Sequence, residues 1–244
     1  MVAYMDAEFN KAEKRGHEGS SLIEIALIIC DLDNAKTDNM VDTYHVYVKP
    51  SNPDEKIYEK ITELTGITQT VIDEQGVPFK QAHFEIVELI RKYEITEIYT
   101  YGDYDKPAIR HNQNQCPDIP NKKTLTKRIV DVAPTVKEKL GLMDKISLEN
   151  LSYIYNCESQ VTHNAMDDAR TLKEVMENIE KDSEEIQEIL TKYKEYEKQR
   201  YENRKLLNAV KNIERFGGDI EGYMDLLKKN QSLASFKKFA ENNV

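Results

Sequence analysis

The sequence predicts an α/β fold, with a mixed five-stranded central sheet flanked by helices and followed by a C-terminal helical appendage. Three strand-like segments separated by polar residues occupy residues 1–49, which is typical of an antiparallel meander. From residue 79 onward, short apolar segments alternate with amphipathic helices, which is typical of strands that pair in parallel. Beyond about residue 180 the chain is rich in Glu, Lys and Tyr and lacks Gly and Pro up to residue 216, which predicts a long helix.

The first three predicted strands are residues 1–9, 22–30 and 43–49. Residues 22–30 are too apolar for either face of that strand to be solvated, whereas residues 43–49 alternate between apolar and polar side chains. The polar segments 10–21 and 31–42 are predicted to be a loop and a turn. Strands joined by such short polar segments pair with their neighbours in an antiparallel sheet.

The later elements of the main domain are predicted from apolar periodicity and from helix start and stop signals. Gly66 ends a helix-prone polar segment, and Pro78 precedes a long amphipathic helix. In order, the predicted elements are a helix-prone segment at 53–63, a helix at 79–93, a strand at 97–101, a helix that starts near Asp105, a strand at 129–132, and helices at 136–142, 148–155 and 165–181.

The charge is unevenly distributed along the chain. The net charge is −10; residues 181–244 carry 13 basic and 12 acidic residues, which leaves 21 basic and 32 acidic residues in 1–180. A surface that wraps nucleic acid is strongly basic, so the acidic main domain argues against a long electrostatic footprint. It is compatible with an enzyme that grips only the end of a strand through bound metal ions.

Composition also bears on the cellular compartment. No stretch of 18 or more apolar residues occurs, so no membrane span is predicted. The first strand begins within two residues of Met1, which leaves no room for a signal peptide. Cys30, Cys116 and Cys157 are widely spaced and odd in number, which indicates buried free thiols in a reducing compartment. These observations predict a cytoplasmic protein.

The chain is predicted to divide into a main domain at 1–180 and a helical extension at 181–244. Within the extension, Gly217-Gly218 ends the long helix, and Asp219 and Ser232 are predicted N-caps of two shorter helices. Its amphipathic segments have three candidate partners: the sheet domain, a second copy of the chain in a homodimer, or another protein. The residues leave these alternatives open.

The first strand carries two carboxylates two residues apart, Asp6 and Glu8. A strand repeats every two residues, so both side chains point to the same face of the sheet. Like charges side by side repel, and a hard divalent cation that takes oxygen ligands relieves that repulsion. The alternative is a solvent-facing edge strand with incidental acids, and this motif alone does not decide between the two.

The turn at residues 101–107 carries a second pair of candidate acids, Asp103 and Asp105. This turn follows a strand and precedes a helix, and ligands bind at such strand ends in open α/β sheets. Read alone, Asp105 is more typical of a helix N-cap. Asp103 is the competing acid in the same turn.

The last helix of the main domain carries the remaining candidates. Asn164 is a predicted N-cap, which places His163 just outside the helix and Asp168 in its first turns. Asp168 shares the inward apolar face of this helix, whereas Asp167 points outward and compensates the helix dipole. A lone His163 is more typical of a solvated loop.

Together these motifs resemble those of the DEDDh subfamily of 3′→5′ exonucleases, the DnaQ-like group within the ribonuclease H-like fold. The resemblance covers roughly residues 1–180 and adds four segments to the acidic motifs, namely 23–26, the strand 44–49 that ends at Pro50, 64–68 and 147–151. The segment Tyr-Gly-Asp-Tyr-Asp at 101–105 is similar to the corresponding turn of the histone-mRNA and small-RNA exonuclease branch. An aromatic residue followed by Asp selects Asp105 over Asp103.

The resemblance implies a site and a reaction. Asp6, Glu8, Asp105 and Asp168 are implied to bind two divalent ions, Mg²⁺ or Mn²⁺, roughly 3.5–4 Å apart, with His163 as the general base. The positions implied to contact the terminal nucleotide are Ala7, Phe9, Asn10 and Tyr104, where Asn10 replaces the Thr of many relatives.

Three functions follow as hypotheses. The first is a free-standing exonuclease that acts on single-stranded 3′ ends, RNA somewhat favoured over DNA, and releases nucleoside 5′-monophosphates. The second is a proofreading-type accessory subunit that docks through residues 181–244. The third, a non-catalytic binding module, is disfavoured because all five residue types of the implied site are present.

Overall fold

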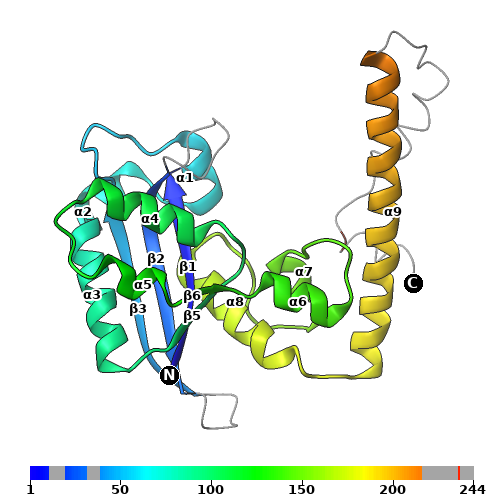
Figure 1. Ribbon diagram of the computed structural model, residues 1–244, viewed down its shortest axis with the longest axis horizontal. Coiled ribbons are helices and arrows are strands. Elements are labelled where there is room, and N and C mark those ends of the chain that lie inside the picture. Colours follow the sequence, from blue (N-terminus) through cyan, green and yellow to red (C-terminus); the bar gives the residue numbers. More distant parts are fainter. Residues whose placement is uncertain (11–19, 32–38, 216–235, 237–244) are drawn as a thin grey trace.

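The computed structural model describes residues 1–10, 20–31, 39–215 and 236. Figure 1 shows two parts, a sheet with helices packed against it and a long helix that stands apart from the sheet. The helix stop predicted at Gly217-Gly218 and the N-caps predicted at Asp219 and Ser232 lie outside the described residues.

The sheet has the strand order β4-β3-β2-β1-β5-β6. Strands β1 to β3 form the predicted antiparallel meander, and β1–β5, β5–β6 and β3–β4 pair in parallel. The bounds are β1 Val2–Asn10, β2 Ser21–Cys30, β3 Met40–Lys49, β4 Val77–Pro78, β5 Glu97–Thr100 and β6 Ile129–Asp131.

The five predicted strands are present, but the described sheet contains a sixth, β4, at its edge beside β3. This strand has two residues and includes Pro78. A segment so short has no side-chain period to read, and Pro is tolerated only at sheet edges or strand ends. The predicted mixed sheet is therefore confirmed. The predicted number of five strands is too low by one, because the edge strand β4 was not predicted.

Strand β1 lies inside the sheet between β2 and β5, and the two faces of the sheet are covered differently. On one face, Met5 and Ala7 pack in a cluster with side chains of α3 (Phe79–Lys92) and α4 (Asp105–Gln115). On the other face, Val2 and Tyr4 pack with α8 (Ala165–Asn178). Alternate residues of one strand therefore serve two cores.

The remaining helices are mostly short. Helix α1 ends at Gly66, which takes the left-handed conformation at φ 75°. Helices α2 and α5 were not predicted, because polar segments of five to seven residues give too few turns for a recognisable apolar period. The bounds are α1 Glu59–Thr65, α2 Gln69–Gln75, α5 Lys122–Thr126, α6 Ala133–Leu140, α7 Leu148–Ile154 and α9 Glu184–Arg215.

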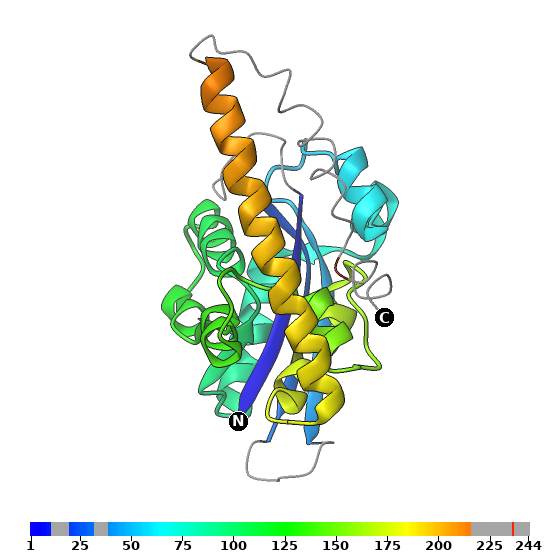
Figure 2. The same cartoon turned by 90° about the vertical axis from the view of Figure 1, so that its right-hand side faces the viewer.

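Helix α9 has 32 residues and stands beside α6 and α7, on the side away from the sheet (Figures 1 and 2). Leu190, Tyr193 and Tyr196 are buried in a cluster with side chains of α6, α7 and α8, and Phe236 packs on both tyrosine rings. The first half of the extension therefore folds back on the main domain. Its role in a homodimer or in docking another protein stays a prediction.

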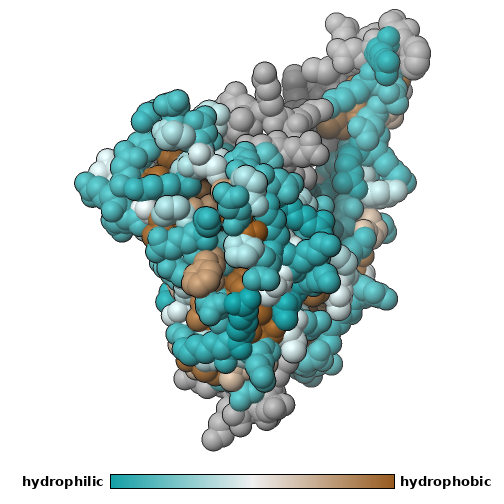
Figure 3. Space-filling view, turned by 60° about the vertical axis from the view of Figure 1, so that its left-hand side comes forward, coloured by the Kyte–Doolittle hydropathy of each residue, from teal (hydrophilic) through white to brown (hydrophobic). Residues whose placement is uncertain are grey.

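The surface of the main domain is mostly polar. The face in Figure 3 is largely hydrophilic, with apolar residues scattered among polar ones. Isolated exposed apolar residues, such as Phe84 at 56% exposure, are normal for a protein surface.

The described part of the chain also bears on the predicted compartment. Among the described residues, no helix is both long enough and apolar enough to cross a membrane. None of the three cysteines forms a disulfide; Cys30 and Cys157 are buried as predicted, whereas Cys116 is only half-buried.

Candidate functional site

Strand β1 places Asp6 and Glu8 on the same side of the sheet. Both side chains keep partial exposure, while their neighbours Ala7 and Phe9 are buried. The alternation follows from the two-residue period of a strand. Because β1 is an inner strand, the edge-strand explanation of these acids is excluded.

Asp105 is the first residue of α4, just beyond the end of β5. It is 7% exposed, whereas Asp103 in the same turn is exposed. The residue in the N-cap position is Tyr104, and no side chain caps the helix there. The buried carboxyl of Asp105 is therefore not explained by helix capping, and it is the acid of this turn that lies inside the protein.

The N-terminus of α8 holds the fourth acid. The side-chain oxygen of Asn164 accepts hydrogen bonds from the backbone N–H groups of Met166 (3.1 Å) and Asp167 (3.3 Å), so the predicted N-cap is confirmed. Asp168 is 6% exposed, and one of its carboxylate oxygens accepts the backbone N–H of Thr162 at 2.8 Å. Asp167 points outward and pairs with Arg170 at 3.0 Å. The inward and outward faces are those that the helical period predicts.

His163 lies in the loop directly before this helix, with an exposed side chain. Its backbone has φ 58°, a left-handed conformation that is uncommon for a residue other than Gly. Ligand atoms of Glu8, His163 and Asp168 all lie within 4.8 Å of one another. The loop therefore brings an imidazole to the acids of β1 and α8.

The four acids influence one another electrostatically. Burial raises the pKa of Asp6 well above its ordinary value, and the charges of Asp105, Glu8 and Asp168 raise it further. Burial, followed by the charges of Asp168 and Glu24, raises the pKa of Glu8 to about 8.

The other two acids are also harder to ionise than usual. Burial raises the pKa of Asp105 to about 7, and it also raises the pKa of Asp168. Carboxylates crowded in this way favour a bound cation, and hard divalent ions take oxygen ligands. The residues present therefore fit a divalent metal site.

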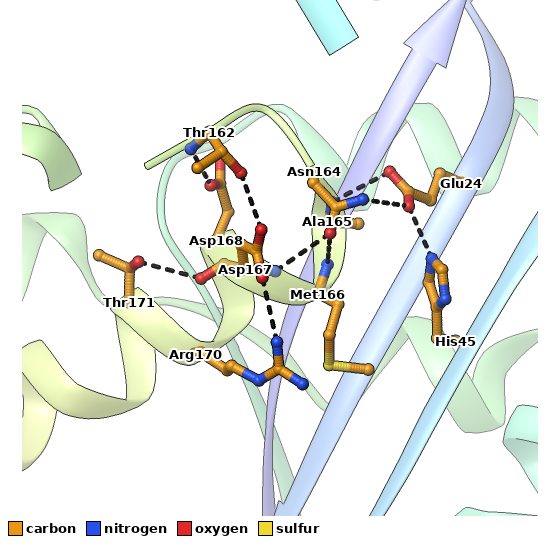
Figure 4. A network of polar contacts seen from close by, with 10 residues as sticks. All are labelled: Glu24, His45, Thr162, Asn164, Ala165, Met166, Asp167, Asp168, Arg170 and Thr171. Atoms are coloured by element: carbon orange, nitrogen blue, oxygen red, sulfur yellow. Dashed lines mark hydrogen bonds and ion pairs between the residues drawn. The ribbon is translucent and has the colours of Figure 1, made fainter. Parts of the chain in front are cut away.

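A fifth carboxylate, Glu24 of β2, is fully buried beside this cluster and was not among the predicted site residues. In Figure 4 it lies between β3 and the start of α8. One oxygen accepts hydrogen bonds from His45 Nε2 (2.6 Å) and Asn164 Nδ2 (3.0 Å), and the other accepts the backbone N–H of Ala165 (3.0 Å). Glu24 thus ties the start of α8, and the His163 loop with it, to the sheet.

One signal in the sequence marks Glu24. It is the single charged residue in an otherwise apolar segment, 22–30, and its strand is buried at every position. A buried charge costs several kcal/mol unless it is paired and hydrogen-bonded, so such a residue has partners elsewhere in the chain. The partners themselves, His45 and Asn164, come from distant segments and were not predictable from this signal.

The four residues predicted to contact the nucleotide differ in how their side chains are packed. Phe9 packs edge-to-face on Tyr104, with ring centroids 5.0 Å apart, and Tyr104 is half-buried. The side chains of Ala7 and Phe9 belong to the core cluster on the opposite face from Asp6 and Glu8. Their contacts with a nucleotide remain predictions.

Asn10 is a different case, because its side chain is already occupied. It is 1% exposed, and its amide donates to Glu55 Oε1 (2.7 Å) and to the carbonyl of Lys56 (3.0 Å) while accepting the N–H of Tyr58 (3.0 Å). Each hydrogen-bonding group of the amide has a protein partner. The structure therefore does not support a substrate contact by this side chain, which instead anchors the segment before α1.

Comparison with known proteins finds one family. A family model described as "RNase_T: Exonuclease" matches residues 4–176, which include every predicted site residue. No curated protein sequence matches the chain.

Several solved structures share the fold at low sequence identity. A full-length 3′-exonuclease has 18% identity and a TM-score of 0.60, with 72% of this chain and 59% of that chain covered. The nuclease domain of 3′hExo, described as a DEDDh family member bound to rAMP, has 17% identity and a TM-score of 0.61, with 72% and 89% covered. E. coli Exonuclease I in complex with a dA16 oligonucleotide has 16% identity and a TM-score of 0.57, with 79% and 44% covered.

Proposed function

The chain belongs to the exonuclease family and is thus an enzyme that hydrolyses nucleic acid, and from this premise we propose that it is a metal-dependent 3′→5′ exonuclease. It acts on single-stranded ends and releases nucleoside 5′-monophosphates. The observation that carries this proposal is the convergence of acids from β1 and α8 beside His163, since ligand atoms of Glu8, His163 and Asp168 lie within 4.8 Å of one another. Asp105 of α4 adds to this cluster, because its charge raises the pKa of Asp6.

In this proposal four clustered carboxylates would hold two divalent cations, Mg²⁺ or Mn²⁺. The cations supply charge neutralisation to the scissile phosphate and to the departing 3′ oxygen. The carboxylate ligands are Asp6, Glu8, Asp105 and Asp168. Asp168 keeps a fixed orientation, because one of its oxygens is held by the backbone N–H of Thr162.

His163 acts as the general base and takes a proton from the attacking water. A positioned imidazole can accept a proton from a water molecule, and this one is exposed at the edge of the acid cluster. Replacing His163 with Ala is expected to leave metal binding nearly intact and to lower turnover by roughly 10²–10⁴. Turnover that stays unchanged in His163→Ala would contradict the role of general base.

The proposed substrate is a single-stranded 3′ end, with RNA favoured over DNA. Among the structures that share this fold, 3′hExo is bound to the ribonucleotide rAMP and Exonuclease I to the DNA oligonucleotide dA16, so the fold by itself does not select RNA or DNA. The similarity of the segment Tyr101–Asp105 to the histone-mRNA exonuclease branch favours RNA. In the cell we expect the protein to act in the cytoplasm.

The test uses single-stranded RNA and DNA, each labelled at the 3′ or the 5′ end, with Mg²⁺, Mn²⁺ or EDTA. We expect monophosphates from the 3′ end, a ladder that shortens toward the 5′ label, and no product with EDTA. Asp6→Ala is the matched control, and products that form equally with this variant would refute the metal site. Release of label from the 5′ end first would refute the polarity.

A further inference from the structure

The loop between α6 and α7, residues 141–147, brings a lysine to the end of β5. A Cβ on residue 102 would collide with Nζ of Lys145, so the ammonium occupies the place where a side chain of residue 102 would begin. The same Nζ lies 5.4 Å from the ring centroid of Tyr101. Gly102 has φ 118°, which favours Gly. The turn that leads to Asp105 thus leaves room for this ammonium.

Lys145 is exposed, and its charge reaches the acid cluster. Burial raises the pKa of Asp105, and the Lys145 ammonium opposes that effect. Among residues 1–10, 20–31 and 39–215, Lys145 forms no ion pair within 4.0 Å. Its charge is therefore available to an anion at the Asp105 side of the site.

The loop that carries Lys145 is held from two sides. The hydroxyl of Tyr101 donates to the carbonyl of Ile146 at 2.6 Å, which joins the loop to the end of β5. From α9, the carboxylate of Glu197 accepts the backbone N–H groups of Met143 (2.8 Å) and Asp144 (2.6 Å). Glu197 is only 6% exposed, so this is a buried carboxylate whose main-chain partners lie within three residues of Lys145.

The charge balance of the site favours a basic side chain near the path of the substrate. Four carboxylates and two divalent ions together carry no net charge, whereas a phosphodiester chain adds a negative charge with every nucleotide. Residues 1–180 carry 11 more acidic than basic residues, so the domain offers little background attraction for that chain. Lysine and arginine side chains supply most charged contacts to backbone phosphates.

We propose that Lys145 contacts a backbone phosphate of the nucleic-acid substrate beside Asp105, and that α9 positions this contact through Glu197. The proposal rests on the proposed exonuclease function and extends it. It assigns the C-terminal extension a part in substrate binding, with Glu197 as a positioning residue that never touches the substrate.

The first experiment measures equilibrium binding, so that its outcome does not depend on turnover. A fluorescent single-stranded oligonucleotide with phosphorothioate linkages at its 3′ end is titrated with the full chain in Ca²⁺, over a range of salt concentrations. Lys145→Ala is expected to weaken binding roughly tenfold and to reduce the slope of log affinity against log salt by roughly 0.7, the loss of one phosphate contact to a single strand. Lys145→Arg should restore most of the affinity.

Lys139→Ala is the matched control, because it removes the same charge from a neighbouring position where Lys139 pairs with Glu180 at 2.5 Å. It should leave affinity and salt slope as in the wild type. Equal affinity and slope for Lys145→Ala and Lys139→Ala would overturn the proposal, and so would a wild-type protein that binds no oligonucleotide.

The second experiment tests the part assigned to α9. Glu197→Gln keeps one acceptor oxygen but loses the other, so it is expected to weaken binding several-fold with a small change in kcat. The double variant Glu197→Gln/Lys145→Ala should bind no worse than Lys145→Ala, since residues that act through one contact are not additive. Additive losses, or wild-type binding by Glu197→Gln, would refute the positioning role. Wild-type protein that binds but does not hydrolyse would refute the proposed function and leave this binding test valid.

Discussion

The two sides of the candidate site are built alike but depend on different parts of the chain. On the His163 side, Glu24 accepts the backbone N–H of Ala165 and so holds the start of α8. On the Asp105 side, Glu197 accepts the N–H groups of Met143 and Asp144 and so holds the loop beside that acid. In each case a buried carboxylate from one element orders a loop of another.

The difference between the sides lies in where the carboxylate comes from. Glu24 belongs to β2, inside the region that matches the exonuclease family, whereas Glu197 belongs to α9, beyond its end at residue 176. The His163 side is therefore complete within the family domain. On the Asp105 side, the loop is also held by Glu197 of the C-terminal extension. This side of the site therefore includes a contact from outside the family domain.

The largest effect is expected from the acids themselves, and each side offers a matched pair. Asp168→Asn and Asp105→Asn remove a buried carboxylate and should lower kcat by at least about 10³-fold, because charge stabilisation by bound metal is lost. Asp167→Asn and Asp103→Asn change the neighbouring outward acids and should stay within about threefold of the wild type. Kinetics on one labelled oligonucleotide would compare all four, and a large loss from either neighbour would reassign the site.

The next effect separates the two supports. Glu24→Gln should lower kcat by about 10–100-fold with little change in KM, because a displaced α8 start moves His163 and Asp168. Glu197→Gln should instead raise KM with only a small change in kcat, because it weakens the binding of the substrate. Glu88→Gln, on the surface of α3 in an ion pair with Arg91, is the control. If Glu24→Gln and Glu197→Gln changed the same kinetic constant, the proposed division between the two sides would be wrong.

Removal of the metal ions should make the stability of the protein depend on pH, because the clustered acids repel one another when they ionise. The pKa of Glu8 is raised to about 8 from 4.5, and that of Asp105 to about 7 from 3.8, so the metal-free folded protein binds more protons than the unfolded chain between those values. Stability in EDTA should therefore fall as pH rises from about 4 to 8. Mn²⁺ should raise Tm, and more so at pH 7.5 than at pH 5.5, because ligands must lose their protons. Melting curves that show the same Mn²⁺ gain at both pH values would contradict this coupling.

The smallest effect is expected at the surface of the His163 side. Arg170→Ala removes the exposed ion pair with Asp167, and such pairs contribute about 0–1 kcal/mol. Chemical denaturation should show a loss below about 1 kcal/mol, with kcat unchanged. A fall in kcat would mean that Asp167 also contributes to the site. The assignment of Asp168 alone as the acid of α8 in the site would then be wrong.

The parts of the site that could be predicted from the sequence are those set by local periods. Asp6 and Glu8 share a face because a strand repeats every two residues, and Asp168 turns inward because a helix repeats every 3.6. Asn10 shows the limit of that reasoning. The resemblance implied a substrate contact for Asn10, but its amide is hydrogen-bonded to a segment 45 to 48 residues away.

The α/β class could be predicted from the sequence, because it follows from alternation and helical spacing, and the resemblance to the exonuclease motifs implied which acids belong together. The inner placement of the first strand came from the strand order of the sheet. The pairing of each buried carboxylate with its loop became visible only in the folded protein. Glu24 meets its partner Asn164 across 140 residues, and Glu197 meets Met143 across 54. Such pairings are decided by the packing of whole elements, which brings side chains together without any local pattern, and they connect the C-terminal helix to the Asp105 side of the site.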